Sequence, residues 1–248
     1  MPGLLASLGG GVVALADDRF MPDRVHIAAV RESGGRSTAG LIRHGTSLGF
    51  DVIEMGPLRV TSLTRTVIDV ARVAPFPTAV AMADAALAGL RDARDRWVRH
   101  PITKQEVVTM AEALGSVRGM ARCRAVIDFA DGKSGSPGES LSRVGIRQLG
   151  FPEPVLQQQF SDHLGSMWTD FWWPEFSLAG EFDGHGKYLR DDYLRGRSTA
   201  QAVIDEKGRE DRLRALGPTV TRWDWTVAKT LPALRAHLLR AGLRLVTR

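Results

Sequence analysis

The chain has 248 residues and a formal net charge of +5, so it is long enough to bury one large core or two small ones and is basic as a whole. Its single cysteine, Cys123, excludes an internal disulfide and any zinc cluster built from thiolates. These features predict a reducing, cytoplasmic location, with Cys123 in the core. No apolar run approaches the roughly 20 residues that a membrane-spanning helix needs, so we expect no membrane contact.

The basic residues are concentrated towards the C-terminus. Residues 187–248 contain 14 lysines and arginines against 7 acidic residues, whereas residues 1–186 contain 19 against 21. A basic surface of this kind favours binding to a polyanion such as DNA. For any single arginine, a solvated helix face is the alternative.

The first half of the chain predicts short strands followed by helices. Alternating apolar residues between glycine and proline turns predict four strands, at 25–30, 41–46, 51–55 and 58–61. Helical spacing then predicts four helices: from a Thr61/Ser62 cap to Pro75, from 78 to 90, from a capping box at 103–106 to 115, and from 117 to 130. Residues 31–37 are expected to form a flexible loop. The glycine- and serine-rich stretch 131–138 predicts a boundary between domains at 1–133 and 134–248.

The second half predicts an α/β domain with the order helix, three strands, helix, strand, helix. Its first helix begins at Ser136, with Pro137 in the first turn and Glu139 completing a capping box. The remaining elements are predicted at 155–161, on both sides of a turn at Pro174-Glu175, and at 199–216, 218–225 and 227–241. Trp223 and Trp225 are expected in the core.

Acidic residues occur among the aromatic residues of the predicted hairpin around this turn, at 169–188. A two-residue turn at Pro174-Glu175 would place Asp170 opposite Ala179 and diagonal to Glu181, with both carboxylates on one face of the sheet. Asp183 shares the face of Glu181. Burying carboxylates together is costly unless cations or hydrogen bonds compensate them, and Mg²⁺ is a common compensating cation. The alternative is a surface hairpin with solvated acids.

Lys187 follows these acids closely in the sequence. A pair of carboxylates with a nearby lysine suits metal-assisted phosphodiester hydrolysis, in which the metal binds the phosphate and activates water while the lysine stabilises developing charge. The pattern therefore predicts a Mg²⁺ or Mn²⁺ site.

The second half resembles the restriction-endonuclease-like fold of PD-(D/E)xK nucleases, and in particular the branch of very-short-patch-repair endonucleases. The resemblance covers residues 135–225 and rests on the order of elements and on these residues: Glu139, Asp170-Phe171, Glu181-x-Asp183-Gly184, Glu206-Lys207-x-Arg209-Glu210-Asp211 and Val220-x-Arg222-Trp223.

This resemblance implies a metal-dependent DNA endonuclease. Asp170 and Glu181 would be metal ligands, Glu139 or Asp183 a further acid of the metal shell, and Lys187 the charge-stabilising residue. The candidate DNA-binding residues are Arg190, Arg195, Arg197 and Arg209. For Arg209, an ion pair between helix and sheet, shared with Glu206, is the alternative.

Residues 58–72, Leu-Arg-Val-Thr-Ser-Leu-Thr-Arg-Thr-Val-Ile-Asp-Val-Ala-Arg, resemble the middle region of AbiEi-type antitoxins of type IV toxin–antitoxin systems. Such proteins usually begin with a DNA-binding winged helix-turn-helix, and no such helix pair is predicted before residue 60. The resemblance implies a toxin partner and leaves room for a homodimer. The alternative function is therefore a non-catalytic DNA-binding or antitoxin-type regulator with a nuclease fold as its scaffold.

Overall fold

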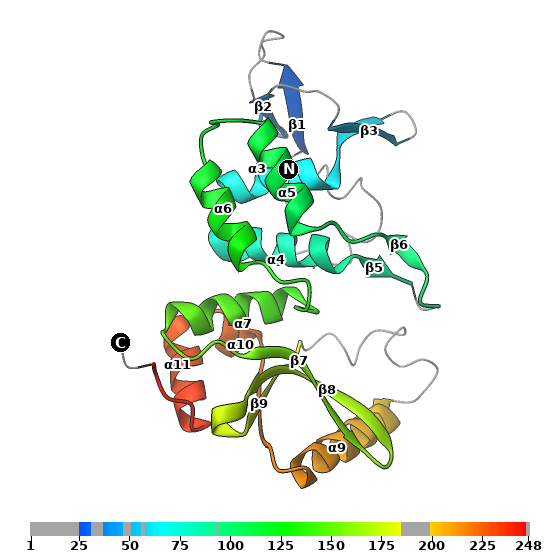
Figure 1. The fold of residues 1–248 in the computed structure, drawn as a ribbon, viewed down its shortest axis with the longest axis vertical. Helices are drawn as coiled ribbons and strands as arrows, with labels where there is room; N and C mark the ends of the chain where they lie inside the picture. Colours follow the sequence, from blue (N-terminus) through cyan, green and yellow to red (C-terminus); the bar gives the residue numbers. More distant parts are fainter. Residues whose placement is uncertain are drawn as a thin grey trace. The chain divides into compact units, whose positions relative to one another are not determined.

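The computed structural model describes residues 25–30, 37–46, 51–55, 58–92, 94–184 and 199–246 (Figure 1). The chain divides into two compact units, Met1–Gly132 and Lys133–Arg248. The first unit is a helical region with short strands, and the second is a four-stranded mixed sheet with helices. At this level the predicted mixture of helix and strand is confirmed.

The short strands of the first unit form two separate pairs. Strands β1 (Val25–Val30) and β2 (Leu41–Thr46) run parallel, whereas β3 (Val52–Met55) and β4 (Leu58–Thr61) form an antiparallel hairpin. All four lie where the sequence predicts strands. Residues 31–36 of the predicted flexible loop lie outside the described residues.

Four helices follow these strands in the described part of the first unit: α3 (Leu63–Val73), α4 (Phe76–Ala88), α5 (Lys104–Ala113) and α6 (Met120–Phe129). Ser62 caps α3, and both hydrogen bonds of the predicted capping box at Thr103 and Glu106 are present. Helix α4 begins earlier than predicted because Pro77 fits the first helical turn, where no backbone N–H is needed. Cys123 is buried on α6, as predicted.

A short hairpin between α4 and α5 was not predicted. It joins β5 (Leu90–Arg91) to β6 (Trp97–Arg99) through a charged turn. The Arg99 guanidinium donates hydrogen bonds to the carbonyl oxygens of Ala85 and Gly89 at 2.7 and 3.2 Å, and so caps the end of α4. The sequence did not predict β5 and β6, because strands of two and three residues are too short to show an alternation of apolar and polar residues.

A buried arginine joins the β3–β4 hairpin to α3. Arg65 is 1% exposed, and its Nε donates to Asp69 Oδ2 at 2.9 Å while Nη1 pairs with Asp51. Thr61 and Thr66 are hydrogen-bonded beside it at 2.7 Å. These polar partners offset the cost of burying the charge.

The second unit follows the predicted order of elements. They are α7 (Pro137–Gln148), β7 (Val155–Asp162), β8 (Gly165–Trp173), β9 (Leu178–Phe182), α9 (Thr199–Ala215), β10 (Thr219–Trp223), α10 (Trp225–Ala228) and α11 (Leu231–Arg240). The sheet order is β10-β9-β8-β7, with β10 parallel to β9 and the other neighbours antiparallel. The single closing helix of the prediction is two helices, because Asp224 caps α10 and Thr230 starts α11.

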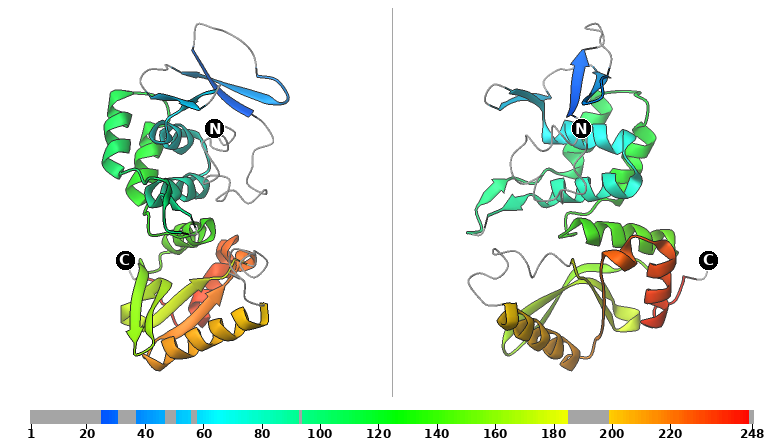
Figure 2. Two further views of the ribbon diagram at one scale, coloured as in Figure 1. Left: turned by 90° about the vertical axis from the view of Figure 1, so that its right-hand side faces the viewer. Right: turned by 180° about the vertical axis from the view of Figure 1, so that it is seen from behind.

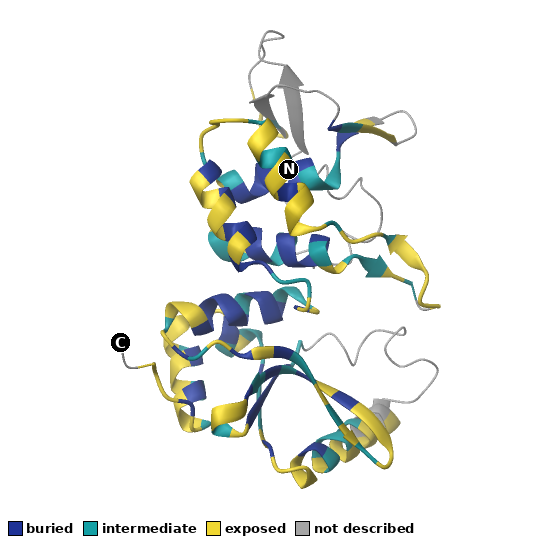
Figure 3. Cartoon of the chain, in the orientation of Figure 1, coloured by how far each residue is buried: buried dark blue, intermediate teal, exposed yellow. Residues whose placement is uncertain are grey.

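The two faces of this sheet are covered differently (Figure 2). Helices α7, α10 and α11 cover one face, and α9 covers the other. The apolar core lies on the first face, where buried residues of α7, α11 and the strands gather (Figure 3). Phe171 and Trp223 stack there, and Leu234 and Leu238 are fully buried. Trp223 is therefore a core residue, as predicted, and Trp225 packs against the core from α10.

The turn between β8 and β9 differs from the prediction. It is a short 3-10 helix, η3 (Pro174–Phe176), followed by Ser177 with a left-handed backbone, so it is longer than the two residues expected. Trp173 consequently pairs with Leu178, and Trp172 with Ala179. The predicted pairing of Asp170 with Ala179 is wrong by two residues, a shift that keeps every side chain on its original face.

None of the helices among the described residues is long and apolar enough to span a membrane.

The contact between α7 and β9 requires a glycine at position 138. A Cβ atom there would overlap the ring of Phe182, whereas a Cβ at Gly208, exposed on α9, would meet nothing within 4 Å. We expect Gly138→Ala to lower the free energy of unfolding by about 1–3 kcal/mol through overpacking. The matched change Gly208→Ala should raise it by up to about 1 kcal/mol through helix propensity. Urea unfolding measures both; equal effects would contradict the close packing of α7 on β9.

Candidate functional site

The first candidate residue, Glu139, lies in the first turn of α7 and is 5% exposed. Ser136 Oγ accepts a hydrogen bond from the Glu139 N–H at 3.2 Å, which is half of the predicted capping box. The Glu139 carboxylate takes a different partner from the one predicted. Its Oε2 accepts from the Gly135 N–H at 2.7 Å, so the acidic group is held at the start of the helix.

Asp170 lies where β8 and β9 separate. Phe171 pairs with Gly180, which is the last pair of the two strands. Beyond it, the Phe182 N–H donates to Asp170 Oδ2 at 2.8 Å instead of to a carbonyl of β8. A hydrogen bond to an ionised acceptor contributes about 1.5–3 kcal/mol, so Asp170 helps to fix the end of β9.

Gln157 connects these two carboxylates. Its Nε2 donates to Glu139 Oε2 at 3.2 Å and to Asp170 Oδ1 at 3.3 Å. The pairs Leu156–Phe171 and Gln158–Thr169 flank it, so Gln157 stands opposite Asp170 in the register of β7 and β8. A helix and two strands therefore bring one amide and two carboxylates together.

The backbone of Gln157 is left-handed, with φ 50°. This conformation costs about 1–3 kcal/mol for a residue that is not glycine and persists only where the surroundings enforce it. Sequence analysis did not single out Gln157. The sequence did contain information about its position. A turn directly after residue 161 sets a register between the two strands that places Gln157 opposite Asp170.

Glu181, a predicted metal ligand, lies in a cluster of charged side chains between the sheet and α9. Arg222, its register partner on β10, contacts Glu181 Oε2 at 2.7 Å, and Arg209 Nη2 contacts Oε1. Glu206 pairs with Arg209 at 2.9 Å and with Arg222 at 2.5 Å. For Arg209, the structure thus has the helix-to-sheet ion pair that the sequence allowed as the alternative to DNA contact.

Burial and ion pairing oppose one another in this cluster. Burial raises the pKa of the Glu181 carboxyl above its ordinary value, and Arg209 and Arg222 offset only part of this effect. Burial also acts to raise the pKa of Glu206, but its hydrogen bonds from Arg209 and Arg222 outweigh burial and leave that pKa lowered. The two acids thus respond differently to the same arginines because Glu181 lies deeper.

The other predicted site residues do not join Glu139 and Asp170 in the contacts described above. Asp183 is half-buried directly after β9, and its N–H donates to the Trp223 carbonyl at 2.8 Å. Within the described ranges, no three or more histidine, cysteine, aspartate or glutamate side chains form a group that could hold a metal ion. The predicted set of Asp170, Glu181 and Asp183 is therefore not assembled there as three ligands. Four predicted residues lie outside the described residues: Lys187, Arg190, Arg195 and Arg197.

Arginines of α9 also hold the β7–β8 hairpin. Arg209 Nη1 donates to the Trp168 carbonyl at 3.1 Å. Arg212 binds both oxygens of Asp162, at 2.7 and 2.6 Å, and lowers the pKa of that carboxyl to about 2. Side chains of one helix thereby fix both β9 and the hairpin that carries Gln157 and Asp170.

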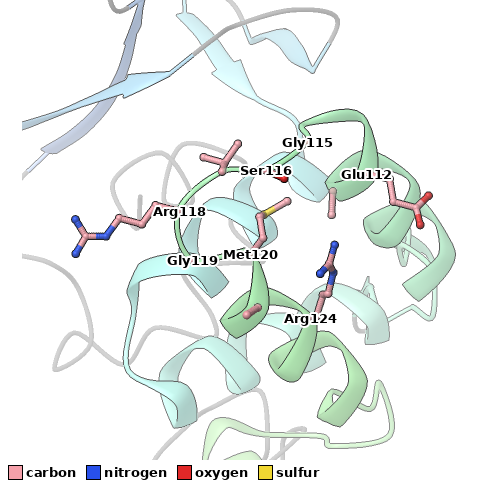
Figure 4. Close-up of a pocket in the computed structure, with 10 residues that line it drawn as sticks. Glu112, Gly115, Ser116, Arg118, Gly119, Met120 and Arg124 are labelled. Atoms are coloured by element: carbon pink, nitrogen blue, oxygen red, sulfur yellow. The ribbon is translucent and has the colours of Figure 1, made fainter.

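The first unit contains a cavity of about 580 Å³ where the chain turns from α5 to α6 (Figure 4). Gly115 and Gly119, both with positive φ, shape its wall, and Glu112 and Arg124 contribute opposite charges. Arg118 points away from the other labelled side chains. None of the predicted site residues lines this cavity.

Two curated proteins of Mycobacterium tuberculosis are similar to the chain: uncharacterized protein MT2308 of strain CDC 1551 / Oshkosh and uncharacterized protein Rv2248 of strain ATCC 25618 / H37Rv. Each is 32% identical over 163 residues, which is 63% of this chain and 56% of the relative. The chain thus spans a little over half the length of the curated relatives it matches. No protein-family model matches the chain, and no solved structure matches it.

Removal of Arg209 tests the charged cluster. We expect Arg209→Gln to lower the free energy of unfolding by about 2–3 kcal/mol, because Glu181 and Glu206 would each lose a partner while staying buried. Arg214→Gln is the control, since that side chain is 54% exposed and its ion pair with Glu210 lies along α9; it should cost about 0.5 kcal/mol or less.

A double-mutant cycle with Glu181→Gln isolates the pairwise coupling, measured by urea unfolding. A coupling energy near zero would show that Arg209 does not hold Glu181.

The bond between Asp162 and Arg212 predicts a pH dependence. The folded pKa of Asp162 is about 2, below its ordinary value of 3.8, so the stabilisation is complete well above pH 3.8 and is lost as the pH falls towards 2. Wild type should therefore have a higher melting temperature than Asp162→Asn at pH 6, and this difference should shrink below pH 4. Asp211→Asn, which removes an exposed charge from α9, is the control. A difference that does not change with pH would count against the ion pair.

Proposed function

We propose that the second unit is a divalent-metal-dependent DNA endonuclease domain of the restriction-endonuclease-like type, which hydrolyses a phosphodiester bond with Mg²⁺ or Mn²⁺ held by Asp170 and Glu139. The observation that carries the proposal is that these two carboxylates, from a strand and a helix, share one Gln157 nitrogen at 3.3 and 3.2 Å. The order of elements from α7 to β10 supports the fold assignment, because it is the helix, three strands, helix and strand of that type.

The donor set suits a hard cation. Mg²⁺ is commonly bound by one or two carboxylates, with water and substrate phosphate in the other positions. Asp170 Oδ1 and Glu139 Oε2 both lie within hydrogen-bonding distance of one nitrogen, and they are the two oxygens that would hold the cation. Such a metal supplies charge for the scissile phosphate and a more acidic bound water.

The remaining acids take different roles in this proposal. Asp183 is the further acid near the metal, because the bond from its N–H to Trp223 fixes it at the end of β9. Glu181 is a positioning residue, since its two arginines hold β9 to α9 and β10. Lys187 keeps the charge-stabilising role that the sequence predicts.

Exposed cations on the second unit support DNA as the substrate. Arg209 is committed to acidic partners, but other arginines and lysines of this unit are exposed, on α9 and α11 and in the segments that follow α10 and α11. They are Lys207, Lys229, Arg235, Arg240 and Arg244. Such cations release counterions from a phosphate backbone, which gives affinity without sequence preference.

A second candidate function is a non-catalytic, antitoxin-type DNA-binding regulator that uses this unit as a scaffold, with a toxin partner or a second copy of the chain. The engagement of Glu181 by Arg209 and Arg222 favours it, because a carboxylate so paired serves stability. In that case DNA binding does not depend on the metal.

Plasmid cleavage separates the two functions. With Mg²⁺ or Mn²⁺, wild type should nick supercoiled DNA, EDTA should stop it, and Asp170→Asn and Glu139→Gln should each reduce the rate on the order of 100-fold. Glu175→Gln, on the exposed turn after β8, should cleave like wild type.

DNA binding in EDTA is measured on the same variants. If wild type does not cleave with either metal while its DNA binding is the same in every variant, the endonuclease proposal fails and the regulator is favoured.

A further inference from the structure

We infer that the Gln157 amide is a built-in substitute for the divalent cation: it donates to both Glu139 and Asp170 in the metal-free protein and must leave when the metal binds. This inference rests on the proposed metal site. It goes beyond that site by assigning a position-specific role to a residue that is neither acidic nor part of the motif shared with nucleases.

The geometry of the amide carries the inference. One nitrogen donates to an oxygen of each carboxylate, at 3.2 Å to Glu139 and 3.3 Å to Asp170. The amide NH₂ has two hydrogens and so satisfies both acceptors at once. Its partial positive charge therefore faces the two oxygens that would hold the cation.

Both carboxylates are held independently of Gln157. The Gly135 N–H fixes Glu139 Oε2, and the Phe182 N–H fixes Asp170 Oδ2. These backbone bonds do not involve the amide, so each acid keeps one anchor when the amide moves. Gln157 is thus the part of the site that has to leave when a cation binds.

The backbone of β7 directs the amide to this point. Gln157 is left-handed, with φ 50°, while its neighbours Leu156 and Gln158 keep the register of the strand pair. An NH₂ group and a metal ion repel each other and compete for the same oxygens. Binding of the metal therefore requires displacement of the amide, and Gln157 lowers the affinity for the metal.

Direct metal binding tests this competition. Mn²⁺ binding to the whole chain, without DNA, is measured by isothermal titration calorimetry for wild type, Gln157→Ala and Asp170→Asn. We expect Gln157→Ala to bind Mn²⁺ on the order of 10-fold more tightly than wild type, because no hydrogen bonds to the amide have to be broken. The control Gln159→Ala, which removes an exposed glutamine from the same strand, should bind like wild type.

A second readout is the shift in melting temperature between EDTA and Mn²⁺. Each variant is its own metal-free reference, so a change in intrinsic stability cancels. The shift should be larger for Gln157→Ala than for wild type. Gln157→Glu, which adds a carboxylate of the same length, should show a lower melting temperature in EDTA and a larger shift than wild type.

The outcomes distinguish the two proposals. Wild-type binding that Asp170→Asn abolishes, with no gain or a loss in Gln157→Ala, would overturn the role of the amide as a substitute and leave the metal site standing. No Mn²⁺ binding by wild type would overturn the metal site, and the inference about Gln157 with it. Tighter binding by Gln157→Ala supports both.

Discussion

Asp170 occupies the point at which β8 and β9 separate, and the site depends on what its carboxylate does there. One oxygen accepts the Phe182 N–H at 2.8 Å, and the other accepts from Gln157. A buried N–H without an acceptor would be costly, so the side chain replaces the carbonyl that a continuing strand would offer. The separation of the strands is thereby stabilised, and it gives Glu139 on α7 access to the same amide.

The two faces of the sheet are packed by different interactions. On the face of α7 and α11, aromatic and aliphatic side chains exclude water, and Trp223 donates to Ser142 Oγ at 2.8 Å within that core. On the face of α9, the interface is ionic and centres on Glu181. A carboxylate buried against arginines is held firmly because removal of either partner would leave an unpaired charge. The second unit thus combines an apolar core on one face of its sheet with a cluster of charged side chains on the other.

This division explains why acids that are close in sequence have different surroundings. Glu181 lies opposite Arg222 and within reach of Arg209, so cations of the protein already compensate it. Asp170 and Glu139 instead share the Gln157 amide as a donor, and each also accepts a hydrogen bond from a backbone N–H. In the proposed endonuclease, an amide that can be displaced suits a site that takes up an external cation, and a permanent ion pair suits a structural role.

Much of the local structure follows from the sequence alone. Side-chain caps and prolines act within one turn of the chain, so the starts of α3, α5 and α7 could be predicted from Ser62, Thr103 and Ser136. Alternating apolar residues likewise predicted the strands of the first unit and the order of elements in the second. The closing helix was harder to predict, because Asp224 and Thr230 cap two helices where one apolar pattern continues.

Only the tertiary structure decided which polar groups meet. The register of β8 and β9 depends on the 3-10 turn at Pro174–Phe176, whose length the dipeptide Pro174-Glu175 does not specify. The partners of Glu181 come from α9 and β10, and those of Glu139 and Asp170 include Gln157 on β7. These contacts join residues far apart in the chain, so spacing along the sequence could identify the acids but not their partners. Sequence by itself thus determined the elements and the acidic residues they carry, whereas packing determined which acid is paired with arginine and which two share an amide.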